Sequence, residues 1–303
     1  MYLKQTQGKA LTLIDGGARG ELFDPFSAVA CPLEVVAFDP DVDAPRGTQK
    51  ERVRRHFINK ALWKETGTVK VHIAHQPATS SVYPPDLELL RTFPDHVGAP
   101  QRTTEKVVEI ESISIDEAVE QGLCPSPDFI KLDIHSAEFE ALQGAENSLR
   151  TSFGVLVESW HSPIHRGQHL TGELEWFLNQ RGFFLFHIMH NSPWPHVVDG
   201  KNLELDRPRM VGTESLFLRD DLHPSNSNQV AGLHALAIAD LFRYNRFAVL
   251  LSRKLLEQKV LDTDLQWEVE KKLNWIAEER LRSTRAIRFF KRRFRNLVRR
   301  MLS

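Results

Sequence analysis

The sequence has few cysteines and no long apolar run. Cys31 and Cys124 are the only cysteines among 303 residues, and neither belongs to a CxxC pair. The sequence therefore supports neither a disulfide framework nor a thiolate metal site, and a reducing compartment is favoured. No stretch approaches the roughly 20 apolar residues of a membrane span, and the first residues carry no apolar run of signal-peptide length. We expect a cytoplasmic globular protein.

Motifs for several common site chemistries are also missing. The sequence contains neither a GxSxG nucleophile elbow nor a P-loop. His161, His165 and His169 recur every four residues, as zinc ligands on a helix do. Pro163 and Gly167 interrupt any helix there, so these histidines do not predict a zinc site.

Charge is unevenly distributed along the chain. Ten of the 39 Lys and Arg residues lie in 280–303 and none of the 40 Asp and Glu residues do, which leaves a net charge of −11 on the first 279 residues. If the tail is helical, its arginines form one stripe and its apolar residues another. Such a helix could bind an anionic membrane peripherally, at the inner face, or pack on the helices predicted at 229–279. Nucleic acid is a weaker candidate, because the acidic body would repel phosphates.

Short apolar runs alternate with helical patterns in the first 222 residues. This alternation predicts βαβ units and a doubly wound, Rossmann-like α/β sheet. Amphipathic patterns predict helices at 136–149 and 170–182, and a Pro- and Ser-rich stretch at 76–104 predicts an excursion above the sheet. The predicted strands are 11–15, 34–39, 59–63, 68–74, 128–133, 153–158, 183–188 and 214–218.

A polar linker, HPSNSNQ, follows residue 222. The remainder of the chain has a helical pattern without a measurable repeat. We therefore expect a Rossmann-like domain in 1–222 and a helical extension in 223–303, which ends in the basic tail at 280–303.

Two sets of residues at predicted strand ends have the chemistry of a nucleoside site. In open α/β folds, ligands bind beyond the carboxyl ends of the strands, near the point where strand order reverses. A glycine-rich turn there lets the backbone approach a ligand and lets the following helix donate amides, and an acid at the end of the next strand accepts ribose hydroxyls. The candidate residues are Asp15, Gly16, Gly17, Ala18 and Gly20 in the turn, and Asp39 as the acid.

Reactive side chains follow two later strands. Alternation along the strand at 128–133 puts Lys131, Asp133 and His135 on one side of it. Glu158 and His161 end the next predicted strand. These residues are expected to lie at the same edge of the sheet as the glycine turn.

The order of these segments resembles that of the FkbM family of methyltransferases. The similarity extends from about residue 11 to residue 219, and it covers far more of the chain than any single motif. The segments that carry it are LIDGGARGE, VVAFDPD, NKALW, ISIDEAV, DFIKLDIHSAEFEALQGA, FGVLVES, PIHRGQHL, RGFFLFHI and ESLFLRD.

The resemblance implies S-adenosylmethionine as cofactor and methyl transfer to an oxygen, commonly a sugar hydroxyl. It also implies that Asp15 and Gly17 line the methionine end of the cofactor and that Asp39 binds the ribose. The chain departs from the family pattern at His135 and Ser136, where relatives usually have Glu or Gln followed by Gly. Glu21 also stands where relatives often have a second glycine.

Oxygen methylation needs a base or a metal at the acceptor hydroxyl. His135 is the preferred base because imidazole titrates near neutral pH, and Asp133 and Glu158 are the alternatives. Asp133 has the chemistry of a Mg²⁺ ligand, but no partner oxygens can be identified, so no metal site is predicted.

Two other functions remain open at this point. The altered residues 135 and 136 are compatible with an inactive scaffold that kept the fold. A nucleic-acid methyltransferase is less favoured, because no N-P-P-Y motif of amino-group methylation is present.

Overall fold

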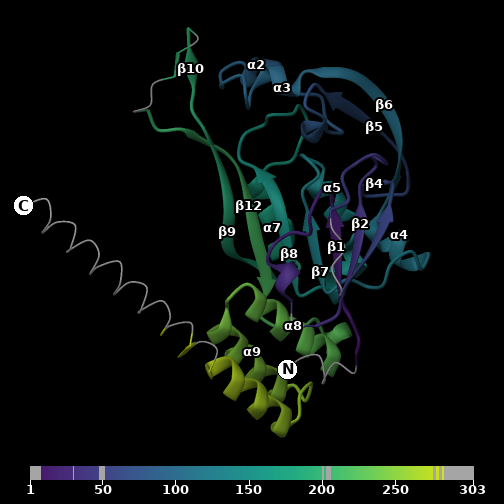
Figure 1. Ribbon diagram of the computed structural model, residues 1–303, viewed down its shortest axis with the longest axis vertical. Helices are drawn as coiled ribbons and strands as arrows, with labels where there is room; N and C mark the ends of the chain where they lie inside the picture. The colour runs from purple at the N-terminus through teal and green to yellow at the C-terminus, as the bar shows by residue number, and fades with distance from the viewer. Residues whose placement is uncertain are drawn as a thin grey trace, which may run out of the picture.

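The computed structural model describes residues 8–29, 31–47, 52–199, 201–202, 206–275, 278–279 and 282. Its centre is a seven-stranded sheet with the order β3-β2-β1-β7-β8-β12-β9 (Figure 1). The first five strands are parallel, and β12 runs antiparallel to both of its neighbours. The doubly wound α/β fold is thus confirmed. The strands are β1 (Leu11–Gly16), β2 (Leu33–Phe38), β3 (Val53–Ile58), β7 (Phe129–Leu132), β8 (Gly154–Trp160), β9 (Phe183–Trp194) and β12 (Arg209–Arg219).

The two faces of this sheet carry separate cores, because successive side chains of a strand point to opposite faces. Ile14 of β1 and Val36 of β2 pack in a core with four helices on one face. Leu13 and Val35 belong to a second core on the other face. The helices of the first face are α4 (Ile115–Glu120), α5 (Glu138–Gln143), α6 (Glu146–Thr151) and α7 (Thr171–Asn179).

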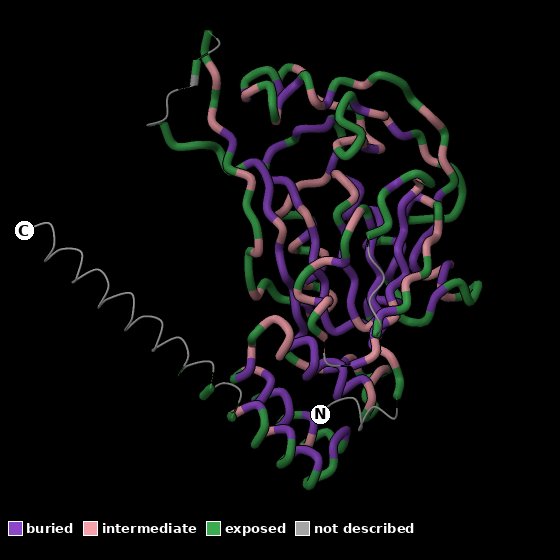
Figure 2. The backbone as a smooth tube through the Cα atoms, in the orientation of Figure 1, coloured by how far each residue is buried: buried purple, intermediate pink, exposed green. Residues whose placement is uncertain are grey.

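The second face is covered by the predicted C-terminal helical extension, which begins with α8 (Gln229–Leu241) and α9 (Asn245–Glu257) after a short turn, η3 (Pro224–Asn226). Every residue from Ala231 to Ala239 in α8 is buried, as Figure 2 shows along this helix. A helix that is apolar on all sides is one enclosed by other elements. Here α8 lies in one core with the sheet and α9.

A helix expected directly after the glycine turn is not formed in the described residues 17–29. That segment contains only the short turn η1 (Phe26–Ala28). Leu22 and Phe26 of this segment belong to the same core as α8. The C-terminal extension thus helps to cover the face on which the first crossover helix was expected.

A buried pair of side chains links α8 to the start of the central strand β7. The Nδ1 atom of His234, a residue only 3% exposed, lies 3.0 Å from Oδ1 of Asp128, and the other oxygen of Asp128 accepts the Thr12 N–H at 2.8 Å. We expect His234→Ala to lower the free energy of unfolding by about 1–3 kcal/mol, because it removes a partner from a largely buried carboxylate. Urea unfolding measures this. His187→Ala, at an exposed position of β9, is the control, and an equal effect of both variants would contradict the role of the pair.

A smaller sheet accounts for two errors in the strand prediction. It consists of β4 (Ala61–Leu62), β6 (Thr104–Ile113) and β5 (Gly67–Ala74), in the order β4-β6-β5. The strand predicted at 59–63 is therefore only two residues long, and that at 68–74 does not join the main sheet. The third strand of the main sheet is instead β3, which the pattern did not predict.

The excursion predicted at 76–104 is present beside this smaller sheet. It contains η2 (Pro77–Thr79), α2 (Leu87–Leu90) and α3 (Ala99–Arg102), and it leads into β6. Figure 1 shows β5, β6, α2 and α3 at one end of the molecule and α8 and α9 at the other. A further hairpin, β10 (Val197–Val198) with β11 (Lys201–Asn202), follows β9.

The helix predicted at 136–149 is divided in two. It breaks at Gly144 between α5 and α6, where a Cβ atom would lie 2.5 Å from the Trp63 carbonyl oxygen. The helix predicted at 170–182 is α7, followed by Gly182 with φ of 80°. The basic tail at 280–303 lies outside the described residues except for Arg282, so its membrane role stays a prediction. No helix among the described residues is long and apolar enough to cross a membrane.

Candidate active site

Two clefts adjoin at the carboxyl ends of the parallel strands. The first, the apolar cleft, has a volume of about 380 Å³ and lies between the ends of β1, β2 and β7 and the smaller sheet; its walls include Leu62, Val71, Ile73, Val108 and Ile110. The second, the polar cleft, has a volume of about 410 Å³, and its walls include Lys131, Glu158, His190, Ser192, Thr213 and Glu214. Gly17, Arg19 and Asp133 line both clefts, so the two meet there.

The glycine turn passes very close to the end of the neighbouring strand. Gly17 has φ of 76°, and a Cβ atom at this position would lie 1.9 Å from the Asp133 carbonyl oxygen. Only glycine fits both the backbone conformation and the space. The turn therefore brings β1 and the segment after β7 together at the junction of the clefts.

The amides of this turn are not directed at a ligand. The N–H groups of Gly17 and Ala18 donate to the Phe38 carbonyl, and that of Gly20 donates to the Pro45 carbonyl. The expected mechanism, in which a helix after the turn donates its amides, is therefore wrong for this chain, because the helix is absent and these amides bond to protein carbonyls.

The candidate cofactor residues are only partly brought together. Asp15 and Ala18 line the polar cleft, Gly17 lines both clefts, and Asp39 lines the apolar cleft. Gly16 and Gly20 line neither cleft. Gly16 is buried between strands, where a Cβ atom would lie 2.8 Å from a Leu62 methyl carbon and 2.9 Å from one of Leu132.

Asp39 follows β2 and is 7% exposed at the edge of the apolar cleft. Its Oδ1 accepts the Asp41 N–H at 2.8 Å, which holds the carboxylate in place. Burial raises the pKa of Asp39, and the Asp41 amide and the Arg19 charge oppose this rise. A carboxylate in this position can accept hydrogen bonds from hydroxyl groups in the cleft.

A buried lysine of β7, Lys131, links that strand to β1. The Nζ atom of Lys131 lies 3.3 Å from Oδ1 of Asp15 and 3.6 Å from Oδ2 of Asp133. Burial alone would lower the pKa of Lys131, but the two carboxylates raise it above its ordinary value. Burial also raises the pKa of Asp15, against the effect of Lys131. This charge network forms the floor of the polar cleft.

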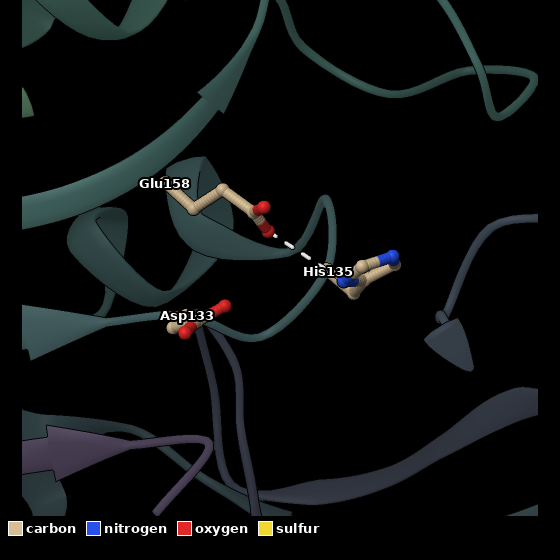
Figure 3. Close-up of side chains that lie close together, drawn as sticks. All are labelled: Asp133, His135 and Glu158. Carbon is tan, nitrogen blue, oxygen red and sulfur yellow. Dashed lines mark ion pairs between the residues drawn. The ribbon is translucent and has the colours of Figure 1, made fainter. Parts of the chain in front are cut away.

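The three candidate catalytic residues lie together. Figure 3 shows Glu158, from β8, directed toward His135, with Asp133 beside them; the last two come from the segment after β7. His135 Nδ1 lies 3.5 Å from Glu158 Oε2. One potential ligand atom from each of the three residues lies within 4.8 Å of the others.

Burial controls the protonation of two members of this group. It lowers the pKa of His135 well below its ordinary value, and the nearby Arg102 and His165 lower it further, so the imidazole is neutral. Burial raises the pKa of Glu158 well above its ordinary value, with further contributions from the negative charges of Asp133 and Glu138. The side chain of Asp133 is 48% exposed at the junction of the clefts.

The backbone that positions His135 has an unusual conformation. His135 and Ser136 have φ values of 58° and 84°, a left-handed region that residues other than glycine rarely adopt. The Oγ atom of the buried Ser136 lies 2.9 Å from His165 Nδ1, and the His165 N–H donates to Gln168 Oε1 at 2.6 Å. These contacts hold Ser136 at the position where glycine is usual in the family pattern. Such conformations cluster at active sites and ligand-binding segments.

Sequence reasoning did not identify the far wall of the polar cleft. This wall consists of His190 and Ser192 from β9 and Thr213 and Glu214 from β12. His190 Nδ1 lies 2.6 Å from Glu214 Oε2. One signal was available, because Glu214 is a charged residue within a run of β12, 211–219, whose other residues are buried.

The histidines that recur every four residues make separate contacts. No helix forms in residues 161–170. His161 contacts Thr213, His165 contacts Ser136, and His169 lies between Glu173 and Glu140.

Two known proteins are similar to parts of this chain. The hexuronic acid methyltransferase AglP of Haloferax volcanii is 39% identical over 70 residues, which are 23% of this chain and 27% of AglP. The chain thus spans about a quarter of that relative's length. The crystal structure of methyltransferase FkbM from Methylobacillus flagellatus KT covers 69% of this chain and 43% of its own, with 13% identity and a TM-score of 0.33.

A match over a longer segment defines the family. The sequence model of the methyltransferase FkbM domain matches residues 21–185, more than half of the chain. It begins just after the glycine turn and includes Asp39, Asp133, His135 and Glu158. The chain belongs to the FkbM methyltransferase family.

Proposed function

We propose that the protein binds S-adenosylmethionine in the apolar cleft and methylates a hydroxyl oxygen of a sugar or glycan held in the polar cleft. The observation that carries this proposal is the meeting of the two clefts at Asp133, beside His135 and Glu158. Displacement at a methyl carbon requires the acceptor and the cofactor to approach in line at short distance. Adjoining clefts with reactive side chains at their junction meet that requirement.

The residues of the apolar cleft fit the cofactor. Its volume lies within the range of about 300–1,000 Å³ that is usual for small-molecule sites. Asp39 can accept the ribose hydroxyls, and apolar side chains such as Leu62 and Ile110 can pack against the adenine. Gly17 and Asp15 lie where the methionine portion would reach the junction. Bound there, S-adenosylmethionine would supply an electrophilic methyl group on a sulfonium sulfur.

The polar cleft supports a polyhydroxylated acceptor. Its walls present hydroxyl, imidazole and carboxylate groups, including Thr213, His190 and Glu214. Together these groups include hydrogen-bond donors and acceptors, which match the hydroxyls of a sugar. AglP, which matches part of this chain, is named for methylation of a hexuronic acid, and this supports a sugar acceptor here.

His135, Asp133 and Glu158 are the proposed catalytic residues. An acceptor hydroxyl loses its proton as its oxygen attacks. His135 is neutral, as a proton acceptor must be, but its lowered pKa makes it a weaker base than the imidazole titrating near neutral pH that the sequence predicted. Glu158 lies 3.5 Å from its Nδ1 atom. Asp133 borders both clefts and can orient the hydroxyl.

The polar cleft does not favour nucleic acid as the acceptor. Its lining includes the carboxylates of Asp15, Asp133, Glu158 and Glu214 against Lys131 and Arg19. A phosphate backbone would be repelled by this excess of negative charge. An inactive scaffold remains the second candidate, because Ser136 departs from the family pattern.

The test is a methyl-transfer assay with deuterium-labelled S-adenosylmethionine and a panel of neutral sugars, hexuronic acids and cell-envelope glycans. Mass spectrometry should detect a labelled methyl group on a glycan, together with an equal amount of S-adenosylhomocysteine. A reaction without acceptor is the blank, and a reaction with RNA tests nucleic acid as the rival acceptor. Cofactor binding without any methylated product would instead indicate a scaffold.

A further inference from the structure

The cluster of Asp133, His135 and Glu158 has the composition of a metal site. Each residue offers one ligand atom, and these three atoms lie within 4.8 Å of one another (Figure 3). Two carboxylates and one imidazole can surround a divalent ion from one side. The residues come from two adjacent parallel strand ends, β7 and β8, so the sheet itself sets their spacing.

The protein satisfies this cluster only in part. Glu158 Oε2 is a buried atom without a hydrogen-bond partner, and His135 Nδ1 is the ring nitrogen that faces it (Figure 3). The 3.5 Å separation between His135 Nδ1 and Glu158 Oε2 is too long for a good hydrogen bond. Buried polar atoms are normally paired, so those left unpaired in a cleft call for an explanation such as an ion or water.

Negative charge also accumulates around Glu158. The carboxyl groups of Asp133, Glu138 and Glu214 act on it, and the charge of Arg102 opposes them. Burial makes such repulsion costly, and a bound cation would relieve it.

The backbone keeps His135 in the cluster. Its φ of 58°, followed by 84° at Ser136, costs conformational energy, and the buried contact of Ser136 with His165 helps to maintain it. Sub-optimal backbone conformations persist where a side chain must be held in one place.

We propose that Asp133, His135 and Glu158 bind a divalent transition-metal ion at the junction of the two clefts. An imidazole with two carboxylates suits Mn²⁺ or a similar ion better than Mg²⁺ or Ca²⁺, which prefer oxygen ligands alone. Three protein ligands leave coordination positions open, as in catalytic metal sites. Asp133 lines both clefts, so these positions are accessible to an acceptor oxygen.

The part of this inference that concerns the acceptor rests on the proposed function, whereas the ion site itself does not. If the ion holds the acceptor oxygen, His135 is a ligand rather than a proton acceptor. No metal site was predicted from the sequence, because Asp133 had no identifiable partners there.

The test is a Mn²⁺ titration of the full chain after removal of metals with a chelator, followed by electron paramagnetic resonance of the free ion. Wild-type protein should bind a single Mn²⁺ per chain in the absence of cofactor and acceptor. Asp133→Asn, His135→Asn and Glu158→Gln should each weaken Mn²⁺ binding by at least about tenfold. Loss of a hydrogen-bond partner of a metal ligand, which is a smaller change, already lowers metal affinity by about that factor. Asparagine suits position 135 because it tolerates positive φ.

His169→Asn is the matched control. His169 lies 3.0 Å from Glu173 and 3.4 Å from Glu140, but outside both clefts. Its variant should bind Mn²⁺ like wild type. The proposal is overturned if wild-type protein binds no Mn²⁺, or if the cluster variants bind it as tightly as the control.

A calorimetric titration of the metal-free protein with S-adenosylmethionine separates this inference from the proposed function. Retained cofactor binding without any Mn²⁺ site would overturn the metal site alone. Mn²⁺ binding without cofactor binding would support the site and count against the methyl-transfer function.

Discussion

Replacing Asp39 by alanine is expected to weaken S-adenosylmethionine binding by roughly 100- to 10,000-fold. In the proposed complex its carboxylate accepts two hydrogen bonds from the ribose, and bonds to a charged group are worth about 1.5–3 kcal/mol each. A factor of ten in affinity corresponds to about 1.4 kcal/mol. Asp39 is 7% exposed and held by the Asp41 amide, so its position is fixed before the ligand binds. Calorimetry on the purified variant measures the change.

Asp43→Ala is the control for this variant. Asp43 is an exposed acid four residues further on and lines neither cleft. It should leave cofactor affinity near the wild-type value. If Asp39→Ala binds S-adenosylmethionine as tightly as Asp43→Ala does, the cofactor does not bind in the proposed orientation.

The central strands could be predicted from the sequence because their burial is continuous. β1 and β2 are buried on both faces, so LTLID and EVVAF stand out as apolar runs. β3 and β6 were not predicted, and β3 shows the reason. In β3 the residues Arg54, Arg55 and His56 interrupt the apolar pattern, because this strand is at the edge of the sheet. Its alternation is too weak to distinguish it from a loop.

The helices show a second limit of sequence reasoning. A continuous amphipathic pattern predicted one helix at 136–149, yet the helix breaks at Gly144, where the Trp63 carbonyl leaves no room for a Cβ atom. That approach depends on a segment about 80 residues away in the sequence. Likewise, nothing near the glycine turn indicates that α8 contributes to the core beside it.

The candidate site was predictable where it depends on strand ends. Asp133 and His135 follow β7, Glu158 lies in β8, and these strands are parallel neighbours, so the three meet as expected. The far wall of the polar cleft was not predictable in this way. His190 and Glu214 face each other because β9 and β12 pair with three register shifts, which a sequence pattern does not reveal.

Turnover should fall by about 100- to 10,000-fold in His135→Asn and in Glu158→Gln, the range that is typical when a group serving the acceptor proton is lost. S-adenosylmethionine affinity should stay near the wild-type value in Glu158→Gln, because Glu158 lines the polar cleft alone, whereas His135 lines the apolar cleft. Stopped assays with the labelled cofactor measure turnover once an acceptor has been found. His169→Asn should retain full activity, and full turnover in both cluster variants would remove them from the mechanism.

The same assay, run with a chelator and then with added Mn²⁺, distinguishes the two roles of His135. If His135 takes the proton directly, wild-type turnover is unaffected by the chelator, and Mn²⁺ does not restore the variants. If the cluster acts through an ion, the chelator abolishes wild-type turnover and Mn²⁺ restores it. In that case excess Mn²⁺ should also partly rescue Glu158→Gln, because Asp133 and His135 still provide two of the three ligands. The direct-base mechanism provides no reason for such a rescue, so this variant discriminates most sharply between the two.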